Sequence, residues 1–133
     1  MNEYAIRVNS KKSFDKTKEI VSQKLLDQGF GILTEIKVHE KFKEKLGIDY
    51  PRYEILGACN PPIAHKALEV DENLGVLLPC NVVLKETNKG TLIIFQNPKE
   101  TFSIVNQPQL SDFAEEVSDR ILKVIQSLEN ELI

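Results

Sequence analysis

The residues best suited to chemistry are the two cysteines, and each is followed directly by an asparagine: Cys59-Asn60 and Cys80-Asn81. Each pair lies beside a proline at the edge of an apolar run. Junctions of this kind, where a strand meets a break, often present side chains to a ligand. The two pairs are therefore the first candidates for a functional site.

The Cys59 thiol is predicted to lie beside the start of a helix, because Asn60 can cap a helix that begins at Pro61. The unpaired N–H groups of a helix N-terminus stabilise a thiolate and attract anions, so a reactive or ligand-contacting thiol is reasonable there. The alternative is a small buried apolar residue, with Asn60 serving only as the cap. For Cys80, in a more apolar segment, burial is the stronger interpretation.

Other sorts of site find little support in the residue types. Cys59 and Cys80 are too far apart for a Cys-x-x-Cys redox motif, and with His65 they fall short of a four-ligand zinc set, so we expect no metal site. The chain has no glycine-rich phosphate loop, and no cofactor is implied. Glu54 and Glu86 are interpreted as solvent-facing strand residues.

The elements before the first pair follow from periodicity and capping residues. Alternation over residues 4–8 predicts a strand, and Ser13 then caps a helix that ends at Gly29. Residues 30–38 predict a second strand, followed by a short surface helix that ends at Gly47.

The elements around the two pairs are a strand over residues 53–58, the helix that starts at Pro61, and a mostly apolar run from Leu74 to Leu84. The apolar run is typical of a central strand, but Pro79 cannot donate to a ladder and so indicates a bulge, an edge or a strand start. A turn around Asn88 predicts a hairpin with residues 91–96.

The clearest element is a long amphipathic C-terminal helix with apolar residues at intervals of three and four from Leu110 to Leu132. Its apolar stripe fits core packing, or alternatively an interface with another subunit. Helices and strands in this order predict an α+β fold with a mainly antiparallel sheet packed on one face by helices.

Composition limits the class of protein. The 133 residues fit one domain over residues 1–133, with 41% hydrophobic and 28% charged residues. A net charge of −3 argues against a nucleic-acid partner, and no apolar run is long enough to span a membrane. With no signal sequence recognisable at the N-terminus, we expect a cytoplasmic protein with reduced thiols.

Three segments together resemble the bacterial and archaeal family known as domain of unknown function 302: residues 29–36, residues 53–61 and residues 75–83. The resemblance implies a compact α+β domain with a β-α-β-β sheet similar to the TATA-binding-protein-like fold. Members of the family are often dimeric, so the resemblance also implies a dimer. It implies no particular reaction.

Carried onto this chain, the family motif implies one pocket lined by Gly57, Cys59, Asn60, Pro61, Pro79, Cys80 and Asn81. The alternative is a structural crossing of two tight turns.

Three functions follow as hypotheses. The first is a homodimeric binding module that holds a small molecule or an anion at the two Cys-Asn junctions. The second is a thiol-dependent enzyme or redox protein in which Cys59 is the nucleophile and Cys80 resolves it. The third is a protein-interaction domain whose cysteines are structural.

Overall fold

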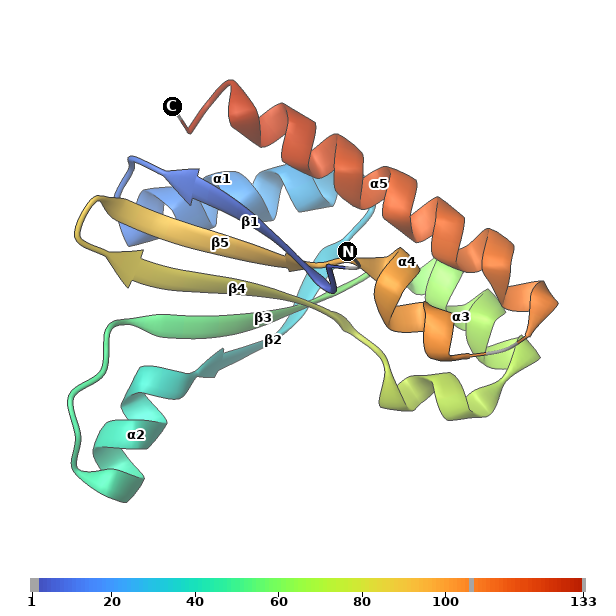
Figure 1. Cartoon of the computed structure of the whole chain (residues 1–133), viewed down its shortest axis with the longest axis horizontal. Helices are drawn as coiled ribbons and strands as arrows, with labels where there is room; N and C mark the ends of the chain where they lie inside the picture. The colour runs from blue at the N-terminus through green and yellow to red at the C-terminus, as the bar shows by residue number, and fades with distance from the viewer. Residues whose placement is uncertain (1–2, 106, 133) are drawn as a thin grey trace.

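The fold is a five-stranded antiparallel sheet with two long helices packed on one of its faces (Figure 1). The computed structural model describes residues 3–105 and 107–132. The strands are β1 (Ala5–Ser10), β2 (Gly31–Lys37), β3 (Tyr53–Cys59), β4 (Cys80–Thr87) and β5 (Gly90–Gln96), and their order in the sheet is β1-β5-β4-β3-β2. The helices are α1 (Phe14–Asp27), α2 (Val38–Leu46), α3 (Pro61–Val70), α4 (Pro98–Thr101) and α5 (Ser111–Glu129), with 3-10 turns η1 (Glu72–Val76), η2 (Phe102–Ile104) and η3 (Pro108–Leu110). The α+β class and the long C-terminal helix predicted from the sequence are confirmed.

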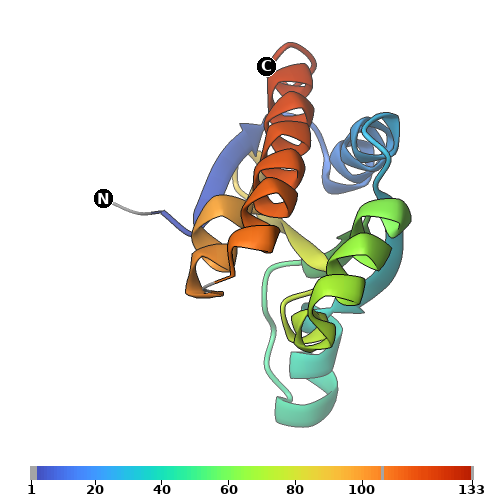
Figure 2. The ribbon, with the colours of Figure 1, turned by 90° about the vertical axis from the view of Figure 1, so that its right-hand side faces the viewer.

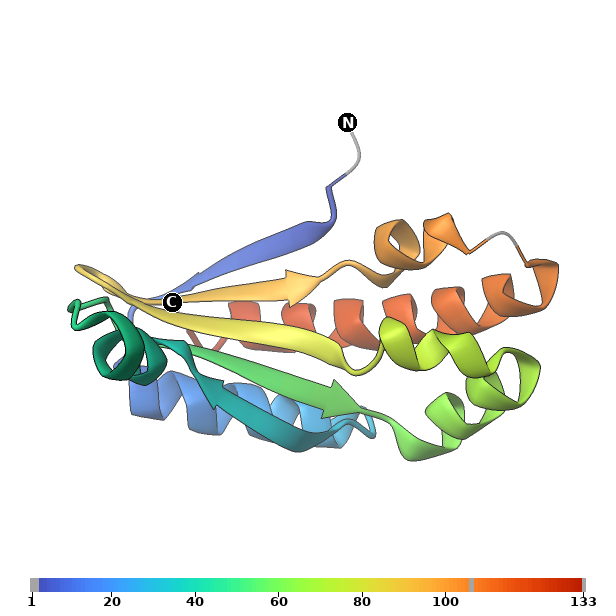
Figure 3. The ribbon, with the colours of Figure 1, turned by 90° about the horizontal axis from the view of Figure 1, so that it is seen from below.

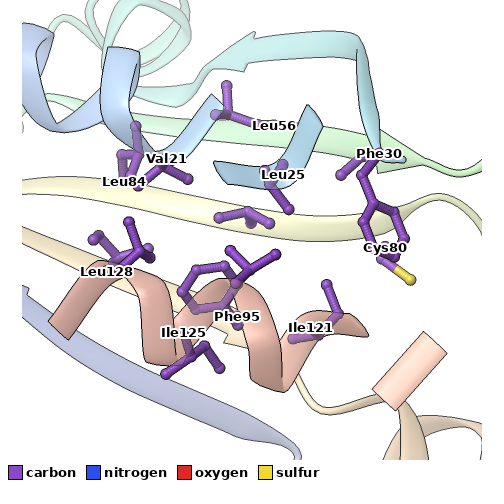
Figure 4. Packing of buried hydrophobic residues seen from close by; sticks show 14 of the residues in the cluster. Val21, Leu25, Phe30, Leu56, Cys80, Leu84, Phe95, Ile121, Ile125 and Leu128 are labelled. Carbon is purple, nitrogen blue, oxygen red and sulfur yellow. The ribbon is translucent and has the colours of Figure 1, made fainter. Parts of the chain in front are cut away.

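Helices α1 and α5 lie side by side over the same face of the sheet, as the end-on view shows (Figure 2). Their apolar stripes meet the inward residues of β3, β4 and β5 in one core (Figure 4). The largest fully buried side chains there include Leu25, Leu56, Leu84, Phe95 and Leu128. The stripe of α5 is therefore used in the core rather than offered to another subunit.

The capping residues act as predicted. Ser13 accepts a hydrogen bond from the Lys16 N–H at 3.2 Å, and α2 ends at Gly47, whose φ of 67° is left-handed. The Asn60 side chain accepts from the Ile63 N–H at 3.3 Å, which starts α3 at Pro61.

The apolar run from Leu74 to Leu84 differs from the prediction of one strand. Its first residues form η1, and β4 begins only at Cys80. Leu74 is buried in a second, smaller cluster between α3, η1, η2 and η3, so its apolar character reflects that packing. Pro79 directly precedes β4, which is the strand-start position among the three predicted for it.

Candidate functional site

The two Cys-Asn pairs meet at one end of the sheet because β3 and β4 are antiparallel neighbours. In the ladder Ala58 pairs with Cys80, and Gly57 pairs with Asn81. Since β3 ends at Cys59 where β4 begins, the two junctions become adjacent in space although they are distant in sequence. Neither cysteine forms a disulfide.

A small cavity lies between the two junctions. It is bordered by Cys59, Asn60, Pro79 and Cys80 and closed by apolar side chains from Phe30, Ile63, Phe113 and Val117. Its volume is about 20 Å³, which is close to the space that one water molecule needs. Cys80 lies beside Phe30 at the end of the core (Figure 4).

The environment of the two thiols opposes ionisation. Burial raises the pKa of Cys59, and burial together with the neighbouring Cys59 raises the pKa of Cys80 to about 12. Of the two interpretations of Cys59, the raised pKa favours a buried residue over a thiol activated by the helix start. The reason is that Asn60 already engages the start of α3: its side chain accepts from Ile63, and its carbonyl oxygen accepts from the Ala64 N–H at 2.9 Å.

The two asparagines have different surroundings. Asn60 is buried and packs against the turn after α1, where a Cβ on Gly29 would come within 2.7 Å of the Asn60 Nδ2 atom. Asn81 is exposed, and its backbone N–H donates to the Gln96 side chain at 3.3 Å. Because neighbouring residues of a strand point to opposite faces, Asn81 and Cys80 lie on opposite faces of the sheet.

Gly57 is required by close approach rather than by a ligand. A Cβ at this position would collide with Thr34 Oγ1 and would lie 2.8 Å from the Cγ atom of Pro79. Pro61 is exposed at the first turn of α3. The predicted site residues thus come together, except for Asn81 and Pro61, around a tightly packed crossing.

The second face of the sheet carries no helix layer, and Figure 3 looks directly onto it. Across this uncovered face runs a row of four β-branched residues in register: Ile94, Val83, Ile55 and Ile36. The first three are half-buried by their neighbours, and Ile36 on the edge strand is 49% exposed. The sequence carries a signal for this row, because β3, β4 and β5 are apolar at successive positions and not only at alternate ones.

Helix α2 projects from the body on the side of the uncovered face (Figures 1 and 3). None of its residues is buried, and its last apolar residue, Leu46, is 64% exposed. Phe42 anchors it through an edge-to-face contact with Tyr50 whose ring centroids are 5.0 Å apart. His39 adds a 3.1 Å hydrogen bond as acceptor from the Tyr53 N–H.

A charged cluster lies on the helix-covered side, and it was missed in the sequence. Glu54 is fully buried, contrary to its interpretation as a solvent-facing residue. Its carboxylate pairs with Lys18 Nζ at 2.8 Å and with Arg52 Nε at 3.0 Å. Burial alone would raise the pKa of Glu54, but the hydrogen bonds and charges of the two cations outweigh it and hold the pKa below its ordinary value.

The cluster is closed by two further carboxylates. Lys18 also pairs with Glu35 at 2.6 Å, and Arg52 pairs with Asp15 at 2.9 Å. The Arg52 guanidinium also stacks 3.9 Å from the centre of the Phe14 ring. The two cations and three carboxylates each have at least one oppositely charged partner, so the cluster joins α1 to β2 and β3.

The part of the chain that the structure describes lacks both a metal-binding cluster and a membrane-spanning helix. There, no three His, Cys, Asp or Glu side chains come close enough together to hold a metal ion. Among the helices of that part, none is both long enough and apolar enough to cross a membrane.

Comparison with known proteins gives one consistent result. Residues 6–128 match the family described as "Domain of unknown function DUF302". A solved structure, described as an uncharacterized conserved protein DUF302 from Bacillus stearothermophilus, is 28% identical and superimposes with a TM-score of 0.85. The match covers 94% of this chain and 98% of that one. Comparison with the curated proteins found no significant match.

Proposed function

This chain belongs to the DUF302 family of domains of unknown function, and we propose that it is a protein-interaction domain that pairs with a second copy through its uncovered sheet face. The observation that carries the proposal is the row of Ile94, Val83, Ile55 and Ile36 across a sheet face that no helix covers. Apolar surface of this kind is stabilised when it is removed from water.

The sheet face alone is too small for a typical specific interface and needs helix α2 to complete it. Strands of six to eight residues make the face roughly 20–25 Å long, and five strands make it about 20 Å wide, or about 450 Å². Two such faces would bury about 900 Å², slightly less than a specific interface usually needs. The protruding helix α2, with Leu46 and Ile48 exposed, would extend the contact beyond the edge of the sheet.

The pattern of polar residues on this face also suits self-pairing. The row beside the apolar row on one side holds Gln96, Asn81 and Thr34, and the row on the other side holds Asn9 and Lys85 together with Leu92 and Tyr53. The charged Arg7 of β1 lies at the end of the apolar row itself. A two-fold axis through the row would place apolar side chains on apolar side chains, with polar groups at the rim.

The other two hypotheses have less support. The cavity at the Cys-Asn junctions has a volume of about 20 Å³, whereas pockets for small molecules usually exceed about 300 Å³. A thiol-dependent reaction needs a thiolate, and the raised pKa values of Cys59 and Cys80 disfavour one.

The test is to place a charge in the middle of the row and measure the mass in solution. We expect the native chain to sediment as a dimer at micromolar concentration and Ile94→Lys to sediment as a monomer, with the affinity of the two copies for each other weakened at least about 100-fold. The matched control is Leu122→Lys, which adds the same charge to an exposed apolar position on α5. Circular dichroism should show that both variants are folded.

Two results would contradict the proposal. One is a native chain that remains monomeric up to high concentration. The other is a Leu122→Lys variant that dissociates as readily as Ile94→Lys, because the interface would then involve α5 or would depend only on net charge.

A further inference from the structure

A basic basin lies at the corner where β1 ends beside the turn of the β4–β5 hairpin. Its volume is about 640 Å³, and the cationic side chains in its wall are Arg7, Lys11 and Lys89. The rest of the wall is polar or apolar, including Asn88 and Leu92, and no carboxylate side chain lines it. This composition is unexpected in a chain whose net charge is −3.

The three cations are not neutralised by neighbours. Within residues 3–105 and 107–132, no carboxylate side chain lies in ion-pair distance of Arg7, Lys11 or Lys89. Glu131, which is next to a wall residue in sequence, pairs instead with Lys24 at 2.8 Å. Like charges close together repel one another, so a site that gathers three of them is stabilised by an anion.

The backbone around the basin is fixed. The Lys11 N–H donates to the Leu132 carbonyl at 3.1 Å, and the Thr91 hydroxyl donates to the Lys12 carbonyl at 3.1 Å. Gly90, with a φ of 140°, lies so close that a Cβ there would meet the Ser10 carbonyl. The loop after β1 is thus held against the hairpin, and Lys11 and Lys89 extend from a common support.

We propose that this basin binds a small organic phosphate. A phosphate monoester is a dianion with three acceptor oxygens, which suits two ammonium groups and a guanidinium better than a single carboxylate does. The apolar floor made by Leu92 and Leu132 would contact the organic part of the ligand. The volume lies in the range of about 300–1,000 Å³ found for pockets that hold such molecules.

Helix α2 of a second copy does not suit the basin as an occupant. Helix α2 carries three lysines, a histidine and two glutamates, so a second copy would not bring it into a basic basin favourably. The basin is formed by one chain, so its binding goes beyond the proposed pairing and does not require it, although Arg7 and Asn9 of its wall lie at the edge of the face proposed to pair. The monomeric Ile94→Lys variant should therefore bind the same ligand.

The experiment is to titrate the ¹⁵N-labelled protein with phenyl phosphate, and separately with phenol and with inorganic phosphate, while amide resonances are followed. Phenyl phosphate should shift the resonances of Lys11, Asn88, Lys89 and Leu92, with a Kd of about 1 mM or tighter. Inorganic phosphate should bind the same residues more weakly, and phenol should not bind.

Two double variants test whether the cations of the basin bind the phosphate group. Arg7→Gln with Lys89→Gln should weaken phenyl phosphate binding at least about tenfold. Lys66→Gln with Lys123→Gln removes the same charge from α3 and α5 and should leave the affinity unchanged. All four side chains are exposed, so the fold should persist, and the dispersion of the amide spectrum verifies this.

Several outcomes would overturn the assignment. One is that the resonances of the basin residues do not shift at about 10 mM phenyl phosphate. Another is that the control variant loses as much affinity for phenyl phosphate as the Arg7→Gln, Lys89→Gln variant. A third is that phenol binds as tightly as phenyl phosphate. A single-stranded oligonucleotide that binds the basin much more tightly than phenyl phosphate would replace the small phosphate with a polyanion as the ligand class.

Discussion

Replacing the buried Glu54 by glutamine (Glu54→Gln) tests how much the charged cluster contributes to the free energy of unfolding. Glutamine keeps the shape and one acceptor oxygen but removes the charge that Lys18 and Arg52 share. Removing one member of a buried ion pair commonly costs 3–5 kcal/mol because the other charge is left alone. Here each cation keeps a second carboxylate, Glu35 or Asp15, so we expect a smaller loss of about 2–3 kcal/mol.

The measurement is urea unfolding at pH 7 followed by circular dichroism. The Lys18→Met variant should lose at least as much stability, because it takes a cation from a carboxylate that has no exposure to water. Glu19→Gln is the matched control, since it removes a carboxylate from an exposed pair with Lys16 on the same helix and should change little.

The pH dependence gives a second check. The pKa of Glu54 is lowered in the folded state, so its contribution is fully present above the unfolded value of about 4.3 and is lost as the pH falls through the folded pKa. The difference between the native chain and Glu54→Gln should therefore shrink below about pH 4. A Glu54→Gln variant as stable as the native chain at pH 7, or a difference that is constant down to pH 3, would refute the reasoning.

Two more predictions concern the crossing of the Cys-Asn junctions. At pH 8 iodoacetamide should alkylate Cys80 more than about 100-fold more slowly in the folded than in the unfolded protein, as measured by mass spectrometry. Cys59 should also react more slowly in the folded protein, but by a smaller factor. A Cys59 that reacts faster when folded would contradict the burial argument. Gly57→Ala should lower the free energy of unfolding by about 2 kcal/mol in urea titrations, because the added Cβ meets Thr34 Oγ1. Combining it with Thr34→Ala should restore part of the loss, and two strictly additive losses would show that the collision is not the cause.

The fold was predictable where its determinants are local. Helix ends are marked by Ser13, Gly47 and the Asn60-Pro61 step. Their capping preferences are local, so they can be recognised without knowing which distant segments they pack against. The order of the helices and strands predicted the sheet with helices on one face, the family resemblance agreed with it, and the match over residues 6–128 confirms the family.

What could not be predicted depends on pairing between distant segments. The junctions of Cys59 and Cys80 meet only because β3 and β4 are neighbours in a particular register. Glu54 is a charged residue in a strand that is apolar on both faces, so alternation could not decide which face it occupies, and one of its cations, Lys18, lies on α1. The basic basin joins the two ends of the chain to a hairpin, and no local pattern of residues reveals it.

The strand order has a consequence for how the chain folds during synthesis. Strands β2 to β5 are neighbours in the order in which they leave the ribosome, whereas β1 must wait for β5, the last strand to appear. Helix α5, which covers the inward side chains of Ile93 and Phe95, emerges later still. Part of the apolar face therefore stays open to water until α5 has left the ribosome. Folding should be one late, cooperative event with the slow kinetics of long-range pairing, and a chain cut after β5 should aggregate rather than form a stable domain.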